Sequence, residues 1–219
     1  MLKKLVAKIK GLSERSSFEA SQFNDPIAEQ TDWSPLKGGG TNFKTHNLKK
    51  VHAQRMVFRC SLGMLLFGGI FFLVGVGVLV GCVIGFFNRG PDTEWQLFVF
   101  LPLFGLAFGA AGFFMLRGAM TPRVFDLSHG YYCRSRKKPE HAFDPSEIKD
   151  HVRLSEIHAL QLLSEYCRGD KSSYYSYELN LILKDGSRIN VVDHGGRSAI
   201  IRDAQELSLF LGKPLWNSI

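Results

Sequence analysis

The sequence is poor in cysteine and lacks the short motifs that hold metals, phosphates or catalytic nucleophiles. Its 219 residues include 4 cysteines, too few for the disulfide framework of a small secreted domain. Its 7 histidines form no HExxH motif, and no CxxC pair accompanies them. A Walker-type phosphate loop, a GxGxxG turn and a GxSxG elbow are absent as well. We therefore predict no metal, no cofactor and no catalytic residue of these classes.

Charge is also missing, over two long stretches. No residue is charged between positions 60 and 88, and a second charge-free stretch runs from 95 to 116. A helix needs about 20 apolar residues to cross a ~30 Å hydrocarbon core. The rest of the chain is too small to bury two helices that are apolar on every side. The sequence therefore predicts a transmembrane hairpin at residues 45–117, with spans at about 60–87 and 96–116.

Lysine and arginine are distributed unevenly around these spans. Residues 1–59 contain 11 of them, the link between the spans contains only Arg89, and 15 follow the second span. Basic residues stay on the cytoplasmic side of a membrane protein. We predict a multi-pass protein of the bacterial inner membrane with both termini in the cytoplasm.

Glycines recur four residues apart in both spans. They are Gly77, Gly81 and Gly85 in the first span and Gly105 and Gly109 in the second. A spacing of four places small residues on one helix face, where two backbones can approach closely. We expect these glycines to pack the hairpin on itself or against a second copy.

Residues 1–44 are predicted to be a basic amphipathic start followed by a flexible tether. Lysines alternate with aliphatic residues over positions 1–12, a pattern typical of a helix on an anionic leaflet or of a solvated chain start. Residues 13–41 are rich in Ser, Asn, Gly and Pro, as linkers are. Beyond them, Leu48, Val51, Arg55 and Phe58 fit a helix that continues into the first span.

Residues 118–219 have the pattern of antiparallel strands followed by one helix. Turn residues predict hairpins at 123–134 and 175–192, and the ambiguous stretch 153–166 is interpreted as a strand. A helical apolar stripe follows, which Ser198 can cap and Gly212 can end. The stripe consists of Ile200, Ala204, Leu207 and Leu211. The predicted fold class is a membrane α-helical hairpin plus an α+β domain, in which a C-terminal helix closes an antiparallel β structure.

The phrases LSEIHALQLLSE, LILKDGSRINVV and AQELSLFLGKPLW carry a resemblance in this region. Their order of elements is similar to that of bacterial two-span membrane proteins with a cytoplasmic pleckstrin-homology-like (PH-like) domain. The resemblance covers about residues 117–212 and includes no catalytic motif. It implies a PH-like fold for the C-terminal domain, and binding or scaffolding in the membrane rather than chemistry.

Two groups of residues could contact an anion or a lipid headgroup. One is a basic run near the second span, and the other is a glycine turn at the start of the last helix, where backbone N–H groups are free. Their members are Arg134, Arg136, Lys137, Lys138, Gly196, Arg197 and Ser198. A solvated surface and an ordinary helix start explain the same residues.

The expected partners are the lipid bilayer, anionic headgroups at its cytoplasmic face, and a protein partner or a second copy. Nucleic acid is not expected, because no binding motif accompanies the basic run. We predict a non-catalytic, membrane-anchored binding or scaffolding module, a subunit or accessory factor of a membrane complex. The alternative is a membrane-bound enzyme with Asp193 and His194 as an acid/base pair between the β domain and the bilayer.

Overall fold

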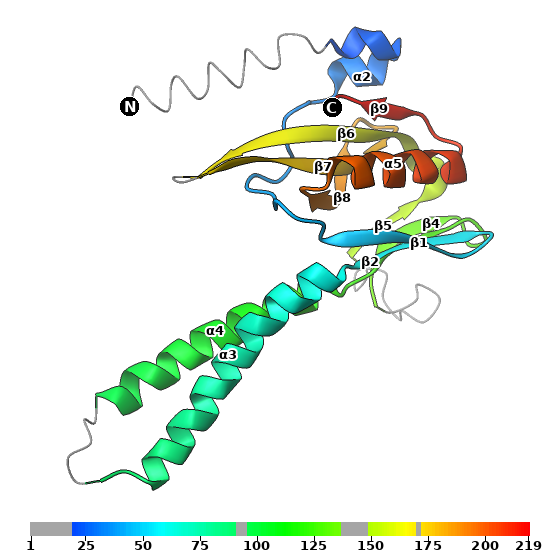
Figure 1. The fold of residues 1–219 in the computed structure, drawn as a ribbon. Helices are drawn as coiled ribbons and strands as arrows, with labels where there is room; N and C mark the ends of the chain where they lie inside the picture. The colour runs from blue at the N-terminus through cyan, green and yellow to red at the C-terminus, as the bar shows by residue number, and fades with distance from the viewer. Residues whose placement is uncertain (1–18, 91–95, 137–148, 170–171) are drawn as a thin grey trace, which may run out of the picture.

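The computed structural model describes residues 19–90, 96–136, 149–169 and 172–219, which form a β domain and a helical hairpin (Figure 1). The β domain contains a five-stranded sheet, a four-stranded sheet and a C-terminal helix. The predicted combination of two long apolar helices, antiparallel sheets and a C-terminal helix is therefore confirmed. The predicted amphipathic start at residues 1–12 lies outside the described residues.

Sheet A, the five-stranded sheet, is built from segments on both sides of the helical hairpin. Its order is β1-β2-β3-β4-β5, and all neighbouring strands are antiparallel. The strands are β1 (His46–His52), β2 (Arg55–Cys60), β3 (Arg123–Asp126), β4 (Tyr131–Arg134) and β5 (Lys149–Arg153). The chain leaves the sheet after β2 and returns at β3, and these two strands are direct neighbours that pair Val57 with Val124.

Residues 46–60 form a β-hairpin, so the helix predicted to lead into the first span is wrong. Met56 and Phe58 are buried in the core between the two sheets, while Val57 belongs to a separate cluster on the other face. This alternation has the period of two of a strand. On its other side β2 pairs with β3, which follows only after both helices, so the place of this hairpin in the larger sheet is not local in the sequence.

Sheet B, the four-stranded sheet, has three strands that correspond to predicted strands and a short last strand that was not predicted. It contains β6 (Ile157–Arg168), β7 (Ser173–Leu183), β8 (Arg188–His194) and β9 (Leu215–Asn217), in the order β8-β7-β6-β9. The strand β9 runs parallel to β6, and the other pairs are antiparallel. The tight turn between β7 and β8 places Gly186 at φ +80°, where a side chain would be strained.

One hydrophobic core fills the space between the sheets, and helix α5 (Arg197–Leu211) closes it. Phe58 of sheet A and Leu160 of sheet B belong to this core and are fully buried. Ile200, Ala204 and Leu207 of α5 are also fully buried, as the helical stripe in the sequence predicted.

The ends of α5 were predicted with partial success. The helix ends at Gly212, whose φ of +62° is the left-handed conformation of a C-cap glycine. The residue that caps its start is Gly196, which has no side chain that could accept from the first turn. The predicted cap at Ser198 is therefore wrong, because Ser198 already lies inside the first turn.

The helical hairpin consists of α3 (Leu62–Phe87) and α4 (Leu97–Ala119). They contain 26 and 23 residues, and at about 1.5 Å per residue both are longer than ~30 Å. Both are long and apolar enough to cross a membrane. Their ends lie within 3 residues of the predicted spans. The link between them, residues 91–95, lies outside the described residues.

The two helices pack through glycines, but not through the complete set that the sequence predicted. A Cβ on Gly75 would overlap the backbone of Gly109, and Gly105 also lies against Gly75. By contrast, a Cβ added to Gly77 or Gly81 would meet no neighbouring atom within 4 Å. Gly77 lies about 200° around the helix from Gly75, on the opposite side.

The seam of α3 repeats every seven residues rather than every four. Gly68 and Gly75 face α4, while Gly85 approaches only the ring of Phe98, at 3.9 Å. On α4, Gly112 lies against the backbone of Phe72. Two helices that stay in contact over several turns meet along positions with an average spacing of 3.5 residues, so a strict spacing of four rotates out of the contact.

Residues 19–45, which we call the strap, lie across the outer face of sheet B and do not form the predicted tether (Figure 1). The strap begins with η2 (Ala20–Phe23) and α2 (Pro26–Gln30). The ring of Trp33 stacks on Phe23 with centroids 5.4 Å apart and lies 6.0 Å from Trp216 of β9. These aromatic contacts fix one end of a segment whose polar composition resembles that of a linker.

Candidate functional site

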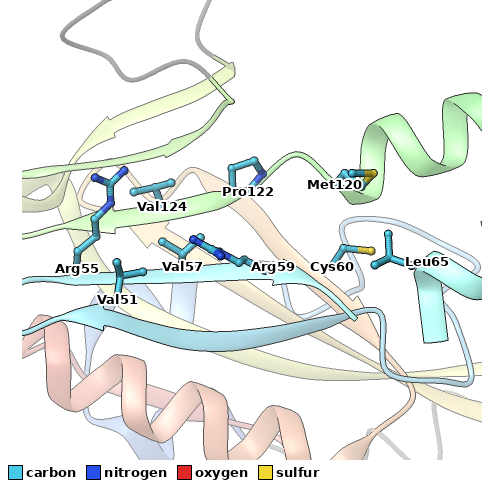
Figure 2. Close-up of a pocket in the computed structure, with 9 residues that line it drawn as sticks. All are labelled: Val51, Arg55, Val57, Arg59, Cys60, Leu65, Met120, Pro122 and Val124. Atoms are coloured by element: carbon cyan, nitrogen blue, oxygen red, sulfur yellow. The ribbon is translucent and has the colours of Figure 1, made fainter. Parts of the chain in front are cut away.

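The β2 pocket is a cavity of about 500 Å³ on the outer face of sheet A, next to the ends of both long helices (Figure 2). Sheet A contributes one wall, and Leu65 of α3 and Met120 after α4 contribute the end nearest the helices. The lining residues are Val51, Arg55, Val57, Arg59, Cys60, Leu65, Met120, Pro122 and Val124. The wall is thus apolar except for two arginines and one thiol.

Both arginines come from β2, where side chains alternate between the two faces of the sheet. Arg55, Val57 and Arg59 are two residues apart and share the outer face. Arg55 Nη1 lies 3.7 Å from Asp126 Oδ2 of β3, so its charge is partly neutralised. Arg59 is exposed, and no carboxylate in the described part of the chain pairs with it. The pocket therefore combines an apolar wall with one guanidinium that no carboxylate of the described residues neutralises.

Cys60 is not an activated nucleophile in this setting. Burial raises the pKa of its thiol, although the positive charge of Arg123 acts in the opposite direction. A reactive cysteine needs a lowered pKa, because the thiolate is the nucleophile. The pocket is suited to binding rather than to covalent chemistry.

A junction of buried polar groups fixes the hairpin to the β domain. The hydroxyl of Ser61, at the start of α3, caps that helix and donates to Lys44 O at 2.5 Å. The amide N–H of Ser61 donates to Thr45 O at 2.9 Å. At the other helix end, Arg123 donates to Thr121 O at 3.0 Å and, across the core, to Val191 O at 3.0 Å. The start of α3 is therefore bonded to the end of the strap, and the segment after α4 is bonded to sheet B through Arg123.

His46 and Arg123 occupy the centre of this junction. Arg123 Nη1 contacts His46 Nε2, and because a guanidinium has only donors, that ring nitrogen accepts. Burial and the charge of Arg123 lower the pKa of His46 to about 3, so its ring is neutral. His46 Nδ1 then donates to Thr45 Oγ1 at 2.8 Å, and Thr45 donates to Asp193 O at 2.6 Å. This chain of hydrogen bonds connects the start of β3 to the end of β8.

Asp193 and His194 do not form the predicted acid/base pair. As neighbours on β8 they point to opposite faces of sheet B. His194 is fully buried, burial lowers its pKa to about 4, and its Nδ1 accepts from Gly196 N at 3.1 Å. Asp193 faces the strap, where burial and the nearby charge of Glu178 raise its pKa to about 6. Neither side chain lines the β2 pocket.

The predicted anion contacts are dispersed over the domain. Arg134 has a structural role, because it lies 3.2 Å from Asp150 and donates to Asn190 O at 2.5 Å. Arg136 donates to Arg117 O at 3.1 Å, at the end of α4. Lys137 and Lys138 lie outside the described residues. Gly196, Arg197 and Ser198 start α5 and do not line the β2 pocket.

Carboxylates beneath the strap were not predicted from the sequence. Glu178 of β7 accepts backbone N–H bonds from Leu36 and Lys37 at 3.0 and 3.3 Å. Glu165 of β6 accepts two more from residues 39 and 40, at 2.9 and 3.2 Å. These strap residues, which have no strand partner, thus satisfy their backbone donors with side chains of sheet B.

The pattern that could have indicated the β2 pocket is Arg55, Val57 and Arg59 alternating with buried Met56 and Phe58. Within the described residues, no group of three His, Cys, Asp or Glu side chains could hold a metal ion. Comparisons with protein-family models, with curated proteins and with solved structures find no match to this chain.

Proposed function

We propose that the protein is a non-catalytic binding or scaffolding module of the bacterial inner membrane, in which α3 and α4 cross the bilayer and the β domain is a cytoplasmic PH-like unit. The observation that carries the proposal is the insertion of the apolar hairpin between neighbouring strands β2 and β3. Two connections, reinforced by the junction around His46, hold the domain to the hairpin more firmly than one linker would.

The exposure of the hairpin supports its placement in a bilayer. Only 6% of the most apolar window of α3 and 17% of that of α4 is buried within the described chain. A core helix of a soluble protein is mostly buried. In a bilayer the same surface contacts lipid, and the helical form lets backbone groups hydrogen-bond within their own segment, as the hydrocarbon core requires.

The distribution of basic residues supports a cytoplasmic β domain. Arg59 and Arg117 flank the two helix ends nearest the domain, together with the buried Arg123. At the far end of α3, Arg89 lies over the ring of Phe86, with its guanidinium carbon 4.3 Å from the centroid. The excess of basic residues at the domain end orients that end toward the cytoplasm.

Two reporters test this orientation. Green fluorescent protein fused after Ile219 should be fluorescent, because it folds in the cytoplasm, and alkaline phosphatase fused there should be inactive. Active phosphatase at that position would refute the proposed orientation.

The scaffolding role is tested by the size of the extracted particle. Gentle extraction in a mild detergent, followed by native mass measurement, should give an assembly larger than one chain. A strictly monomeric chain with no co-extracted protein would contradict scaffolding and would leave only the membrane anchor.

A further inference from the structure

We propose that the β2 pocket binds one anionic phospholipid, with the phosphate at Arg59 and part of an acyl chain along the apolar wall. The inference rests on the proposed membrane placement of α3 and α4, and it assigns a ligand class to a site that the sequence did not indicate. The ligand class is inferred from the position of the pocket, from its apolar wall and from its charge.

The position of the pocket is that of a lipid headgroup. Leu65 lies in the first turn of α3, and Met120 is the residue that ends α4. When these helices cross a bilayer, their domain-side ends lie at the boundary between acyl chains and headgroups. Figure 2 shows the lining side chains arranged from these two residues along β2.

The wall of the pocket suits an acyl chain. Val57 and Val124 form its base, together with Pro122, and Val51 stands at the margin with 48% of its surface exposed. Each methylene group buried against such a wall is removed from water, which favours binding. A small soluble anion would leave this apolar surface in contact with water.

The charge of the pocket suits a phosphate. Arg59 is exposed and has no carboxylate partner within the described residues, whereas Arg55 is 3.7 Å from Asp126. Lys49 of β1 pairs directly with Val57, so it stands on the same face of sheet A. A guanidinium binds a phosphate with two parallel hydrogen bonds, and a neighbouring lysine adds positive potential.

Together these features favour a lipid over a soluble phosphate compound. Both ligands would satisfy Arg59, but only a lipid also covers the wall formed by the valines. A lipid also arrives from the bilayer in which the helix ends are placed, so it needs no path through water.

The test measures which lipids stay bound to the full-length protein. The chain is reconstituted in nanodiscs with equal amounts of phosphatidylglycerol and phosphatidylcholine, extracted into mild detergent and passed over a sizing column. Retained lipid is then quantified by mass spectrometry. The wild-type protein should retain phosphatidylglycerol in preference to phosphatidylcholine.

Two variants of the pocket and one matched control define the result. Arg59→Glu should reduce phosphatidylglycerol retention by about tenfold, because a charge-assisted hydrogen bond is replaced by repulsion. Val51→Trp should reduce it without any change in charge, since the larger side chain fills the margin of the cavity. Arg168→Glu makes the same charge change at an exposed position at the end of β6 and should leave retention unchanged.

Three outcomes would overturn the inference. One is unchanged retention in Arg59→Glu, and another is an equal loss in Arg168→Glu, which would indicate a non-specific charge effect. The third is full displacement of the lipid by soluble glycerol phosphate, which would identify a soluble ligand. The nanodisc assay does not depend on orientation in the cell, so a failure of the reporter test and a failure of lipid binding are distinguishable.

Discussion

At the scale of single residues, the buried polar groups of the β domain explain its local geometry better than its apolar residues do. Arg123 is 8% exposed, and its guanidinium is bonded to a neutral histidine and two backbone carbonyls rather than to a carboxylate. Such a charge is costly to bury unless its donors are satisfied. The hydrogen bonds therefore fix the position of the helix ends relative to the sheets.

Asp193 gives a pH-dependent prediction at this scale. Its pKa in the folded protein is about 6, above its ordinary value of 3.8. Between pH 3.8 and about pH 6, Asp193 is therefore mostly protonated in the folded state and mostly ionised in the unfolded state. Its contribution to stability therefore falls as pH rises through that window and is unfavourable above it. Asp193→Asn should stabilise the protein by roughly 2 kcal/mol at about pH 7.5 and have little effect near pH 4.

The measurement is denaturant unfolding in mild detergent, monitored by tryptophan fluorescence at both pH values. Asn190 Nδ2, which donates to Asp193 Oδ1 at 2.9 Å, keeps an acceptor in this variant. His46 and His194 have lowered pKa values and make stability fall as pH decreases below about 6.5, so the quantity compared is the difference between variant and wild type. A difference that does not change with pH would contradict the assignment.

At the scale of elements, the parts that local sequence determines were predicted, and the parts that depend on distant partners were not. The strands β7 and β8 were predicted because their alternation and the turn at Gly186 are local. The strands β1 and β2 were missed because β2 acquires its neighbour β3 only after two intervening helices. The strap has the composition of a linker, and the carboxylates that order it lie more than 100 residues away in the sequence.

The candidate site was missed for the same reason. The walls of the β2 pocket come from three strands and two helix ends that the topology brings together. The basic run at residues 134–138 is prominent in the sequence instead, because its charges are contiguous. A run of charges can be recognised in the sequence itself, whereas a pocket lined by separate elements can be recognised only when the fold is known.

The hairpin seam predicts a difference between two neighbouring glycines. Gly75→Leu should separate α3 from α4, because even a Cβ at this position overlaps the backbone of Gly109. Gly77→Leu is the matched control, since nothing lies within 4 Å of its Cβ position. Cross-linking between cysteines introduced at Phe71 and Phe108, whose rings stack across the seam with centroids 5.5 Å apart, should be lost in the first variant and kept in the second. Equal yields in both variants would contradict this seam.

The strap predicts a pattern of proteolysis. Lys37 is a trypsin site whose backbone N–H is bonded to Glu178 at 3.3 Å, so cleavage after it requires local opening. Trp33→Ala removes the ring that packs on Phe23 and Trp216 and should accelerate this cleavage by about tenfold. Leu209→Ala, at a position that is 85% exposed on α5, is the control. Rapid cleavage of the wild-type protein would show that the strap is not held in place.

At the scale of the whole molecule, the domain and the hairpin form one unit. The chain leaves sheet A at the end of β2, passes through both helices and returns to the same sheet at β3, the direct neighbour of β2. Any tilt or rotation of the hairpin acts directly on β2 and β3, which carry Arg59 and Val124 of the β2 pocket. The proposed lipid site and the proposed membrane anchor are therefore parts of the same arrangement.

The central claim is that α3 and α4 span the membrane with the β domain on the cytoplasmic side, and labelling of introduced cysteines tests it most directly. In a variant whose four native cysteines are replaced by serine or alanine, Asn88→Cys marks the far end of α3 and Leu209→Cys marks the domain. With a membrane-impermeant maleimide, and with the outer membrane made permeable, we predict labelling at position 88 in intact cells and at position 209 only after lysis. Labelling at position 209 in intact cells, or at both positions to the same extent before lysis, would contradict the account.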